Sequence, residues 1–588
     1  MGQFFKMFFA SLLAMVIFGV LAVIIMVAWV VGIANSVSDN KPSAGNKAVL
    51  YLDLGQAIQE QVQDNPLSAL NTEDQFDTPG LYDMVRLIKY AKTDSSIKGI
   101  YIKCADNANG FATSDELRGA ILDFKNSKKF VYAYADVISQ KAYYIANIAD
   151  KVYCNPKGGL EWKGFALQYM FFKQTLDKIG VEPQIFYAGK FKSATEPFRT
   201  DHMTDANKLQ SSVFLNDLYN RFLTETSVAR NVDTASLHHY ANTFAIQTAD
   251  DAVKYKLLDG TKYDDEVKGE IKEKLQLGAQ AKINFITVGK YAKSVTYKNG
   301  SGSDKIALIY AQGDIVDGKG EKGQIGGDTY RGLIRTARMD DNIKAIVIRV
   351  NSGGGSAMAS ENMWREISLA KKQKPVILSF GDYAASGGYY MSCGADSIFT
   401  EANTLTGSIG VFSIIPNLQK FFNDKLGVTF DGVKTSPYAD MPTASRPLND
   451  MEKKFLQNDV DSIYNTFLHR VSAGRRIDVA LVDSIGQGRV WTGTRGIQIG
   501  LADKLGNLQD AIDCAARMGK VKDFRLKEYP EPMSWWETIF GGYKKTMQTK
   551  ALKEELGAEG VNMYNNIKKI KQSVGSAQAR MPFDVTIN

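Results

Sequence analysis

The first feature of the chain is a long run without charged residues near its N-terminus. Residues 7–33 carry no charged side chain and are almost entirely apolar. A helix of about 20 such residues crosses the hydrocarbon core of a bilayer, whereas the apolar part of a cleavable signal peptide has about 7–15 residues. The run therefore predicts a retained transmembrane anchor over 7–33, between a short segment (1–6) and a polar linker (34–46). Cleavage near 34–36 is the alternative.

After this run, short β-branched segments alternate with stretches of helical spacing. In the later part of the chain, residues 345–350 have the pattern of a buried strand, 359–372 carry apolar residues at helical spacing, and 375–380 have the pattern of another strand. Alternating strands and helices are typical of α/β folds with parallel strands. The body is therefore predicted to be an α/β structure.

The body also contains an internal repeat. Residues 96–103 match 342–349, and 136–144 match 382–390 at the same offset. A constant offset over so long a stretch indicates a tandem duplication in which each copy has the length of a domain. The predicted divisions are a first domain at 47–290, a linker at 291–304, a second domain at 305–520, and a helical, amphipathic tail at 521–588.

Composition and charge exclude several classes of protein. The net charge of +7 is the small difference between 71 basic and 64 acidic residues, too weak and too dispersed for a nucleic-acid-binding protein. The four cysteines form no Cys-x-x-Cys pair, so neither a zinc knuckle nor a redox motif is predicted. No metal and no organic cofactor is expected.

Two glycine-rich segments follow predicted strands in the second copy. They are 351–356 (NSGGGS) and 384–389 (AASGGY). Glycines let backbone N–H groups approach a ligand, and two such groups aimed at one oxygen form an oxyanion hole. Ser386, at a predicted helix start and before two glycines, is placed to attack a carbonyl whose oxygen lies in that hole. Either segment taken alone is also compatible with an ordinary tight turn.

A serine nucleophile needs a base, and histidine is the usual one. The chain has only four histidines, and none lies in a glycine-rich or strand-end setting. A Ser-His-Asp triad is therefore poorly supported. A lysine can serve instead where burial favours its neutral form, although most lysines are solvated surface residues.

Four motifs occur together in the body. They are 190–197 (KFKSATEP), 352–356 (SGGGS), 385–389 (ASGGY) and 404–410 (TLTGSIG). In this combination the chain resembles the signal peptide peptidase A family in its long, double-domain form, from about residue 46 to about residue 520. The resemblance implies a tandem duplicated spiral of ββα units like that of crotonases and Clp proteases. One departure is Gly353, where the family usually has proline, which leaves that loop less rigid.

The resemblance also implies a Ser–Lys dyad. Ser386 corresponds to the family's nucleophile, Lys192 to its general base, and Ser408 to the serine that orients the lysine. The oxyanion would be received by backbone N–H groups among Gly354, Gly355 and Gly387.

The repeat supports one composite site. Opposite Ser386 the first copy has Gln140, and opposite Lys192 the second copy has Ser436. Each copy thus keeps what the other has lost. This pattern favours a single site built from both domains over two independent sites.

These observations lead to the expectation of a membrane-anchored serine endopeptidase that degrades remnant signal peptides and other peptides at the lipid bilayer. The resemblance further implies a single-pass protein of the cytoplasmic membrane, with its body on the outer, periplasmic face, and a homo-oligomer. Two other classes stay open: a crotonase-type acyl-CoA hydratase or thioesterase, and a non-catalytic membrane scaffold. The sequence does not decide whether the dyad forms within or between chains.

Overall fold

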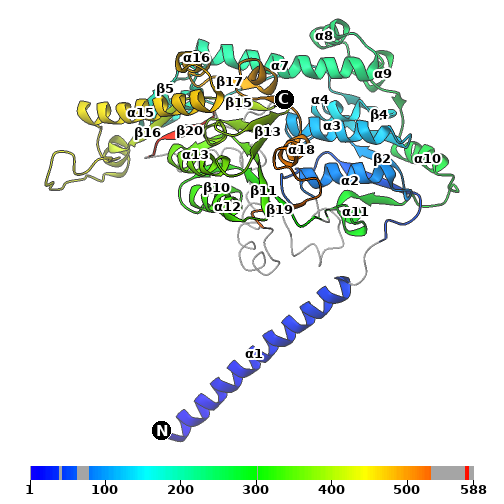
Figure 1. The fold of residues 1–588 in the computed structure, drawn as a ribbon, viewed down its shortest axis with the longest axis horizontal. Coiled ribbons are helices and arrows are strands. Elements are labelled where there is room, and N and C mark those ends of the chain that lie inside the picture. The colour runs from blue at the N-terminus through cyan, green and yellow to red at the C-terminus, as the bar shows by residue number, and fades with distance from the viewer. Residues whose placement is uncertain are drawn as a thin grey trace.

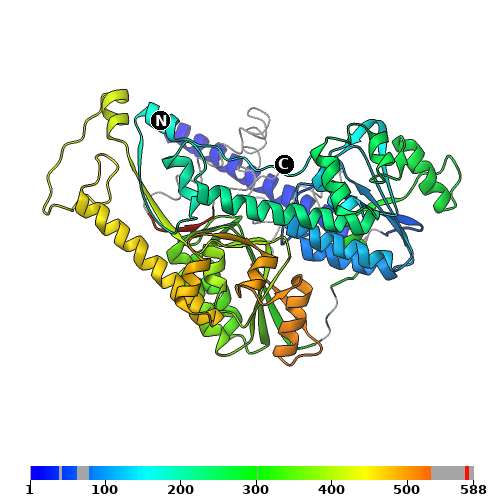
Figure 2. The ribbon, with the colours of Figure 1, turned by 90° about the horizontal axis from the view of Figure 1, so that it is seen from above.

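The computed structural model describes residues 2–38, 43–62, 79–298, 300, 302–531 and 576–581. Its first element, the helix α1 (Gly2–Ser38), stands apart from the body in Figure 1 and contains the predicted anchor. Within the described part of the chain, α1 is the one helix long and apolar enough to cross a membrane, over Gly2–Ala22. The body beyond it consists of two halves that lie side by side in Figure 2.

The first half builds a parallel sheet whose two faces are both covered by helices. Leu50 and Ile100 lie in a core shared with α2 and α3, whereas Val49 and Tyr101 contact α10 on the opposite face. Successive strand residues are therefore buried, as in other doubly covered sheets. In sheet order the strands are β6 (Gly260–Thr261), β4 (Lys151–Leu160), β3 (Phe130–Ile138), β2 (Ile97–Lys103), β1 (Ala48–Asp53) and β7 (Phe285–Thr287).

The longest helix of the first half, α7, also reaches the second half. It begins after Thr204, whose side chain accepts from the Asn207 N–H, and it contacts both α4 and β17. Figure 2 shows it running across the molecule. The helices of this half are α2 (Leu81–Thr93), α3 (Phe111–Lys125), α4 (Gln140–Ala146), α5 (Lys173–Ile179), η3 (Ser193–Thr195), α6 (Glu196–Arg199), α7 (Asp205–Arg230), α8 (Thr234–Asn242), α9 (Ala249–Lys254), α10 (Asp264–Lys274) and α11 (Val288–Ser294).

The second half repeats this architecture. Its main sheet has the order β17 (Val490–Thr492), β15 (Leu405–Gly407), β13 (Val376–Ala385), β11 (Ile343–Ser352), β8 (Lys305–Gln312) and β19 (Arg525–Tyr529), with β14 (Ser397–Thr400) and β18 (Lys504–Leu505) beside β13. Its helices are α12 (Gly327–Met339), α13 (Ala357–Lys371), α14 (Gly387–Ser392), η4 (Phe421–Leu426), α15 (Asp450–Arg475), α16 (Val479–Ile485), α17 (Gly493–Gln498) and α18 (Leu508–Met518).

The two halves follow the same order of elements. In each, a strand, a helix, a second strand, another helix and a third strand precede a short helix, which is α4 in the first half and α14 in the second. The three strands pair in parallel in both halves, β1–β2–β3 and β8–β11–β13. The predicted tandem duplication and α/β class are confirmed.

A third sheet combines strands of both halves. In order it contains β10 (Gln324–Gly326), β9 (Asp314–Val316), β12 (Gly354–Ser356), β20 (Gln578–Arg580), β16 (Val411–Asn417) and β5 (Glu182–Ala188). The strand β5 belongs to the first half and pairs antiparallel with β16 of the second, with Ala188 opposite Val411. This pairing carries the chain that follows β5 into the second half.

The described parts of the predicted helical tail, 521–588, differ from the prediction. They contain β19, which extends the main sheet beside β8, and β20 in the mixed sheet. Both are strands because a neighbouring strand supplies hydrogen-bond partners, which a pattern along the chain does not reveal. Residues 532–575 and 582–588 of this tail lie outside the described residues.

Candidate active site

Ser386 lies where β13 ends and α14 begins. Its backbone has φ 53° and ψ −115°, and its side chain is completely buried. Strain of this kind persists only where the surroundings hold it and is frequent at active sites. The next two residues must be small: a β-carbon on Gly387 would lie 2.7 Å from Ser360 Oγ, and one on Gly388 would lie 2.8 Å from the Ser352 carbonyl oxygen. The turn thus leaves the Ser386 hydroxyl without a neighbouring side chain on its own segment.

Lys192 comes from the first half, on the loop that follows β5. Its Nζ lies 2.8 Å from Ser386 Oγ. The residue is only 1% exposed, so its amine is removed from water. Two residues from different copies of the repeat are therefore within hydrogen-bonding distance in a single chain.

Ser408 contacts the same amine. Its Oγ lies 3.2 Å from Lys192 Nζ, and its carbonyl oxygen lies 3.3 Å away. The Ser408 backbone has φ 50°, and its N–H donates to the Arg489 carbonyl oxygen at 2.7 Å. Oxygens of Ser386 and Ser408 therefore surround the amine and hold it beside the hydroxyl.

Burial determines the charge of this lysine. Desolvation lowers the pKa of Lys192 well below its ordinary value, because the ammonium form loses its hydration. A neutral amine 2.8 Å from a hydroxyl can accept the hydroxyl proton. The arrangement can therefore activate a serine for attack on a carbonyl without a histidine.

The loop that carries Lys192 is held by the turn before β17. The Phe191 N–H donates to the Gln487 carbonyl oxygen at 2.7 Å. A β-carbon on Gly488 would lie 2.6 Å from the Lys192 nitrogen, so only glycine allows this approach. Gly189, with φ 112°, lets the chain leave β5 toward this turn.

Sequence reasoning missed Gln210, which fixes the same loop. From the buried face of α7, its Nε2 donates to the Phe191 carbonyl oxygen and to Ser193 Oγ, each at 2.9 Å. Its Oε1 accepts from the Val490 N–H at 3.2 Å. Gln210 thereby ties the lysine loop to β17 of the second half. Nothing in the sequence marked it, since a glutamine in a helical stretch is usually a surface residue.

Glu196 stabilises the other end of the loop. It is 1% exposed and accepts from Asn207 Nδ2 at 2.9 Å and from Thr204 Oγ1 at 2.5 Å. A buried carboxylate with such partners anchors the segment at the start of α7. Its place in the motif 190–197 was the signal in the sequence.

The three predicted oxyanion-hole glycines lie together beside Ser386. Gly354 and Gly355 have φ 98° and 155°, and a β-carbon on Gly354 would lie 2.6 Å from the Gly387 nitrogen. The Gly354 N–H already donates to Ser352 Oγ at 3.1 Å. Gly387 is the first residue of α14, where N–H groups have no partner within the helix.

The first-half counterpart of this turn holds no hydroxyl. Gln140 is buried, and its Oε1 accepts from the N–H groups of Lys163 and Gly164 at 2.7 and 2.9 Å. Its side chain therefore closes the equivalent position with backbone hydrogen bonds. Ser436, the predicted counterpart of Lys192, lies exposed after η4.

Histidines and metal ligands do not contribute to this arrangement. His202, His239 and His469 are exposed, and His238 contacts Tyr219 on α7. Among the described residues, no group of three or more histidine, cysteine or acidic side chains could hold a metal ion.

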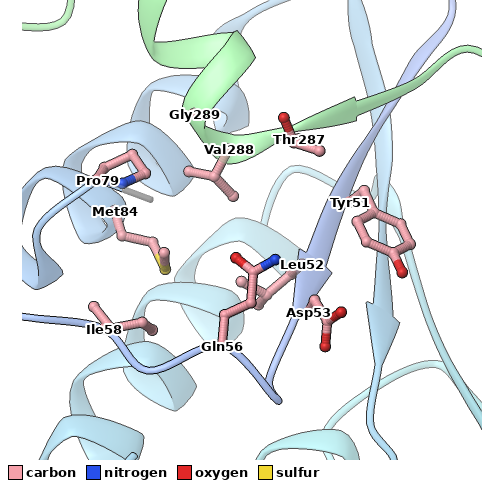
Figure 3. Close-up of a pocket in the computed structure, with 10 residues that line it drawn as sticks. All are labelled: Tyr51, Leu52, Asp53, Gln56, Ile58, Pro79, Met84, Thr287, Val288 and Gly289. Carbon is pink, nitrogen blue, oxygen red and sulfur yellow. The ribbon is translucent and has the colours of Figure 1, made fainter. Parts of the chain in front are cut away.

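A small pocket in the first half lies apart from the predicted site residues. It is lined by residues at the carboxyl end of β1, including Asp53 and Gln56, and by Thr287 and Val288 opposite them (Figure 3). Its volume of about 30 Å³ is that of a single water molecule. It is too small for a peptide substrate.

Comparison with known proteins identifies the family. The family model described as peptidase family S49 matches twice, over 123–278 and 368–522, which together make up more than half of the chain. The two matches lie in the two halves of the body. They agree with the duplication seen in the structure.

Individual relatives support the same assignment. Protease 4 of Salmonella typhi is 33% identical over 542 residues, which cover 89% of this chain and 87% of that protein. The chloroplastic serine protease SPPA of Arabidopsis thaliana is 32% identical over 77% of this chain and 68% of its own length. Among solved structures, the 1510-N membrane-bound stomatin-specific protease covers 39% of this chain with a TM-score of 0.26 and 14% identity. The resemblance found in the four motifs is thus confirmed, and the chain belongs to peptidase family S49 and is a serine-type peptidase.

Proposed function

We propose that this peptidase is a membrane-anchored endopeptidase in which Ser386 is the nucleophile and Lys192 the general base. One observation carries the proposal, the buried contact of 2.8 Å between Lys192 Nζ and Ser386 Oγ. The lowered pKa of Lys192 supports it, because only a neutral amine can accept a proton. The strained turn at Ser386 supports it as well.

In the proposed reaction, Ser386 Oγ attacks the carbonyl carbon of the scissile peptide bond and its proton moves to Lys192 Nζ. The oxyanion accepts from the Gly387 N–H and from that of Gly354 or Gly355. The existing bond from Gly354 to Ser352 Oγ favours Gly355. The ammonium then protonates the leaving amine while Ser408 holds it in place. Water hydrolyses the ester with Lys192 again as base.

The location and substrates in this proposal rest on α1 and on the four sequence motifs. An apolar helix at the N-terminus would hold the body at a lipid bilayer, where remnant signal peptides and other apolar peptides collect. We place the body on the outer, periplasmic face of the cytoplasmic membrane and expect a homo-oligomer. Protease protection of the body in sealed spheroplasts would contradict the periplasmic location, and a monomer in mild detergent would contradict the oligomer.

Replacement of the nucleophile tests the proposal. Ser386→Ala should lower turnover of a fluorogenic peptide by many orders of magnitude, since removing the nucleophile of such an assembly costs about 10⁶-fold in a well-studied serine protease. Ser462→Ala, an exposed serine on α15, is the matched control and should leave turnover unchanged. Turnover by Ser386→Ala within tenfold of the wild type would refute the proposal.

A further inference from the structure

A segment from the C-terminal end of the chain lies beside the candidate active site. The strand β20 pairs antiparallel with β12, with Ala579 opposite Gly355 and Arg580 opposite Gly354. Its other edge pairs with β16, where Gln578 lies opposite Phe412. The segment is therefore an inner strand of the mixed sheet.

The flanking backbone hydrogen bonds define how this strand is seated. The Met581 N–H donates to the Gly353 carbonyl oxygen at 2.8 Å, and the Ala357 N–H donates to the Ala577 carbonyl oxygen at 3.2 Å. Hydrogen-bonded pairs alternate along an antiparallel ladder, so the pair between them, Gly355 and Ala579, is also of this kind. The Gly355 N–H is thus directed at the Ala579 carbonyl oxygen.

This seat is a slot for one extended peptide. In the described part of the sheet, β12 pairs with β9 on one side and β16 pairs with β5 on the other. Only β20 lies between β12 and β16. An extended peptide that adds a strand to such edges binds through its backbone, and its alternate side chains determine specificity.

The carbonyl of Ala579 lies at the glycines of the proposed oxyanion hole. A β-carbon on Gly354 would lie 2.2 Å from the Ala579 carbonyl oxygen, and one on Gly387 would lie 2.9 Å from the same oxygen. Gly387 directly follows Ser386. The peptide carbonyl closest to these glycines is therefore that of the bond between Ala579 and Arg580.

The side chains of the segment alternate between two faces, as in any strand. The Ala579 side chain is completely buried, and Met581 packs in a cluster with Ala385 and Leu405. On the other face, Arg580 forms an ion pair of 2.6 Å with Asp314. The slot therefore encloses a small residue immediately before the carbonyl and accepts a basic residue after it.

We propose that the segment 576–581 is an intramolecular substrate and that the peptidase cleaves its own chain between Ala579 and Arg580. The inference rests on the proposed function, because Ser386 performs the step. Ser386 Oγ bonds to the Ala579 carbonyl carbon, and its proton passes through Lys192 to the departing Arg580 amine. One water molecule then hydrolyses the ester. The products are residues 1–579, with a new carboxylate, and the nonapeptide 580–588.

The seated segment also accounts for a preference. A side chain larger than alanine before the scissile bond would have to displace the residues that bury Ala579. Small residues are therefore expected at that position in other substrates. Until residues 576–581 leave the slot, they compete with any peptide added from outside.

Mass spectrometry of the purified full-length chain tests the inference. The wild-type protein in detergent should lose residues 580–588, and the free nonapeptide should appear, whereas Ser386→Ala should stay intact. The first-order rate should not change when the protein is diluted about tenfold, because the substrate is part of the same chain. A rate proportional to protein concentration, or cleavage at another bond, would overturn the proposal.

Two substitutions at one position provide matched controls. Ala579→Gly keeps a small side chain and should be cleaved within about tenfold of the wild-type rate, whereas Ala579→Trp should stay intact. A fluorogenic peptide with the sequence Ser-Ala-Gln-Ala-Arg-Met-Pro reports separately on the proposed function. If it is cleaved while the tail of the wild type persists, the self-cleavage inference alone is wrong. If neither is cleaved, the proposed function fails as well.

Discussion

At the scale of single residues, the environment of Lys192 decides what the candidate site can do. The amine has hydroxyl and carbonyl oxygens around it, and burial alone lowers its pKa. A carboxylate beside it would favour the ammonium form and remove the base. In the proposed mechanism the lysine is therefore a base because its partners are uncharged.

Peptidase activity is expected to rise with pH as Lys192 loses its proton, with a midpoint well below that of free lysine. Lys192→Arg should lower kcat/KM by at least about 10³-fold across the range, since arginine cannot be deprotonated. The measurement is kcat/KM for a fluorogenic peptide from about pH 5 to about pH 10. Lys190→Arg, at an exposed position on the same loop, should retain the wild-type profile. A Lys192→Arg protein with most of its turnover would contradict the dyad.

The same lysine should reduce stability. Its pKa is lower in the folded than in the unfolded chain, so between those two values the unfolded chain binds more protons and stability rises with pH. Lys192→Met removes the ionisable group and should increase the unfolding temperature at neutral pH while abolishing activity. Thermal unfolding followed at neutral and alkaline pH measures this, with Lys190→Met as the exposed control. A lower unfolding temperature for Lys192→Met at neutral pH would show that desolvation of the amine is not a net cost.

At the scale of elements, the site depends on a helix that contacts neither reacting atom. The α7 residue Gln210 joins the lysine loop to β17 through bonds to Phe191 and Val490. It is a positioning residue, because it sets where Lys192 lies relative to Ser386. A displacement of about 1 Å in such an arrangement can reduce the rate about 10²-fold.

Gln210→Ala is therefore expected to lower kcat about 10- to 100-fold with little change in KM. The midpoint of the pH profile should also rise toward that of free lysine, because a looser loop admits water to the amine. Asn220→Ala, an exposed residue of the same helix, should change neither quantity. A reduced kcat with an unshifted profile would mean that Gln210 acts only through stability.

The elements that sequence reasoning predicted are those that depend on neighbours along the chain. The strand, glycine turn and helix around Ser386 have a local pattern, and the repeat revealed the two halves. The antiparallel pairing of β5 with β16, and the seat of β20 beside β12, depend on hydrogen bonds between distant segments. Such pairing leaves no periodicity in either segment. For Lys192, composition and spacing favoured a surface residue, and only the motif resemblance identified it.

At the scale of the whole molecule, the two halves are joined by buried charges. Arg349 of β11 is completely buried; its Nε donates to Glu60 Oε2 at 2.9 Å, and it also pairs with Glu116 of α3. Both carboxylates come from the first half. Removing one partner of such a cluster typically costs about 3–5 kcal/mol, because a charge is left buried without compensation. The cluster therefore favours a fixed arrangement of the halves of one chain.

This arrangement predicts how two inactive variants behave together. Since Lys192 and Ser386 already meet within one chain, mixed oligomers of Lys192→Arg and Ser386→Ala should recover less than about 5% of wild-type activity, the background expected when every chain lacks half of its dyad. The two variants would be co-expressed with different affinity tags and purified through both, so that only mixed assemblies are assayed. Wild-type chains mixed with Ser386→Ala provide the control and should show activity in proportion to the wild-type chains present. If the mutant pair recovers a quarter or more of the activity, the loop carrying Lys192 must reach Ser386 of a neighbouring chain. The link between the halves through Arg349 would then be too weak to keep the site within one chain.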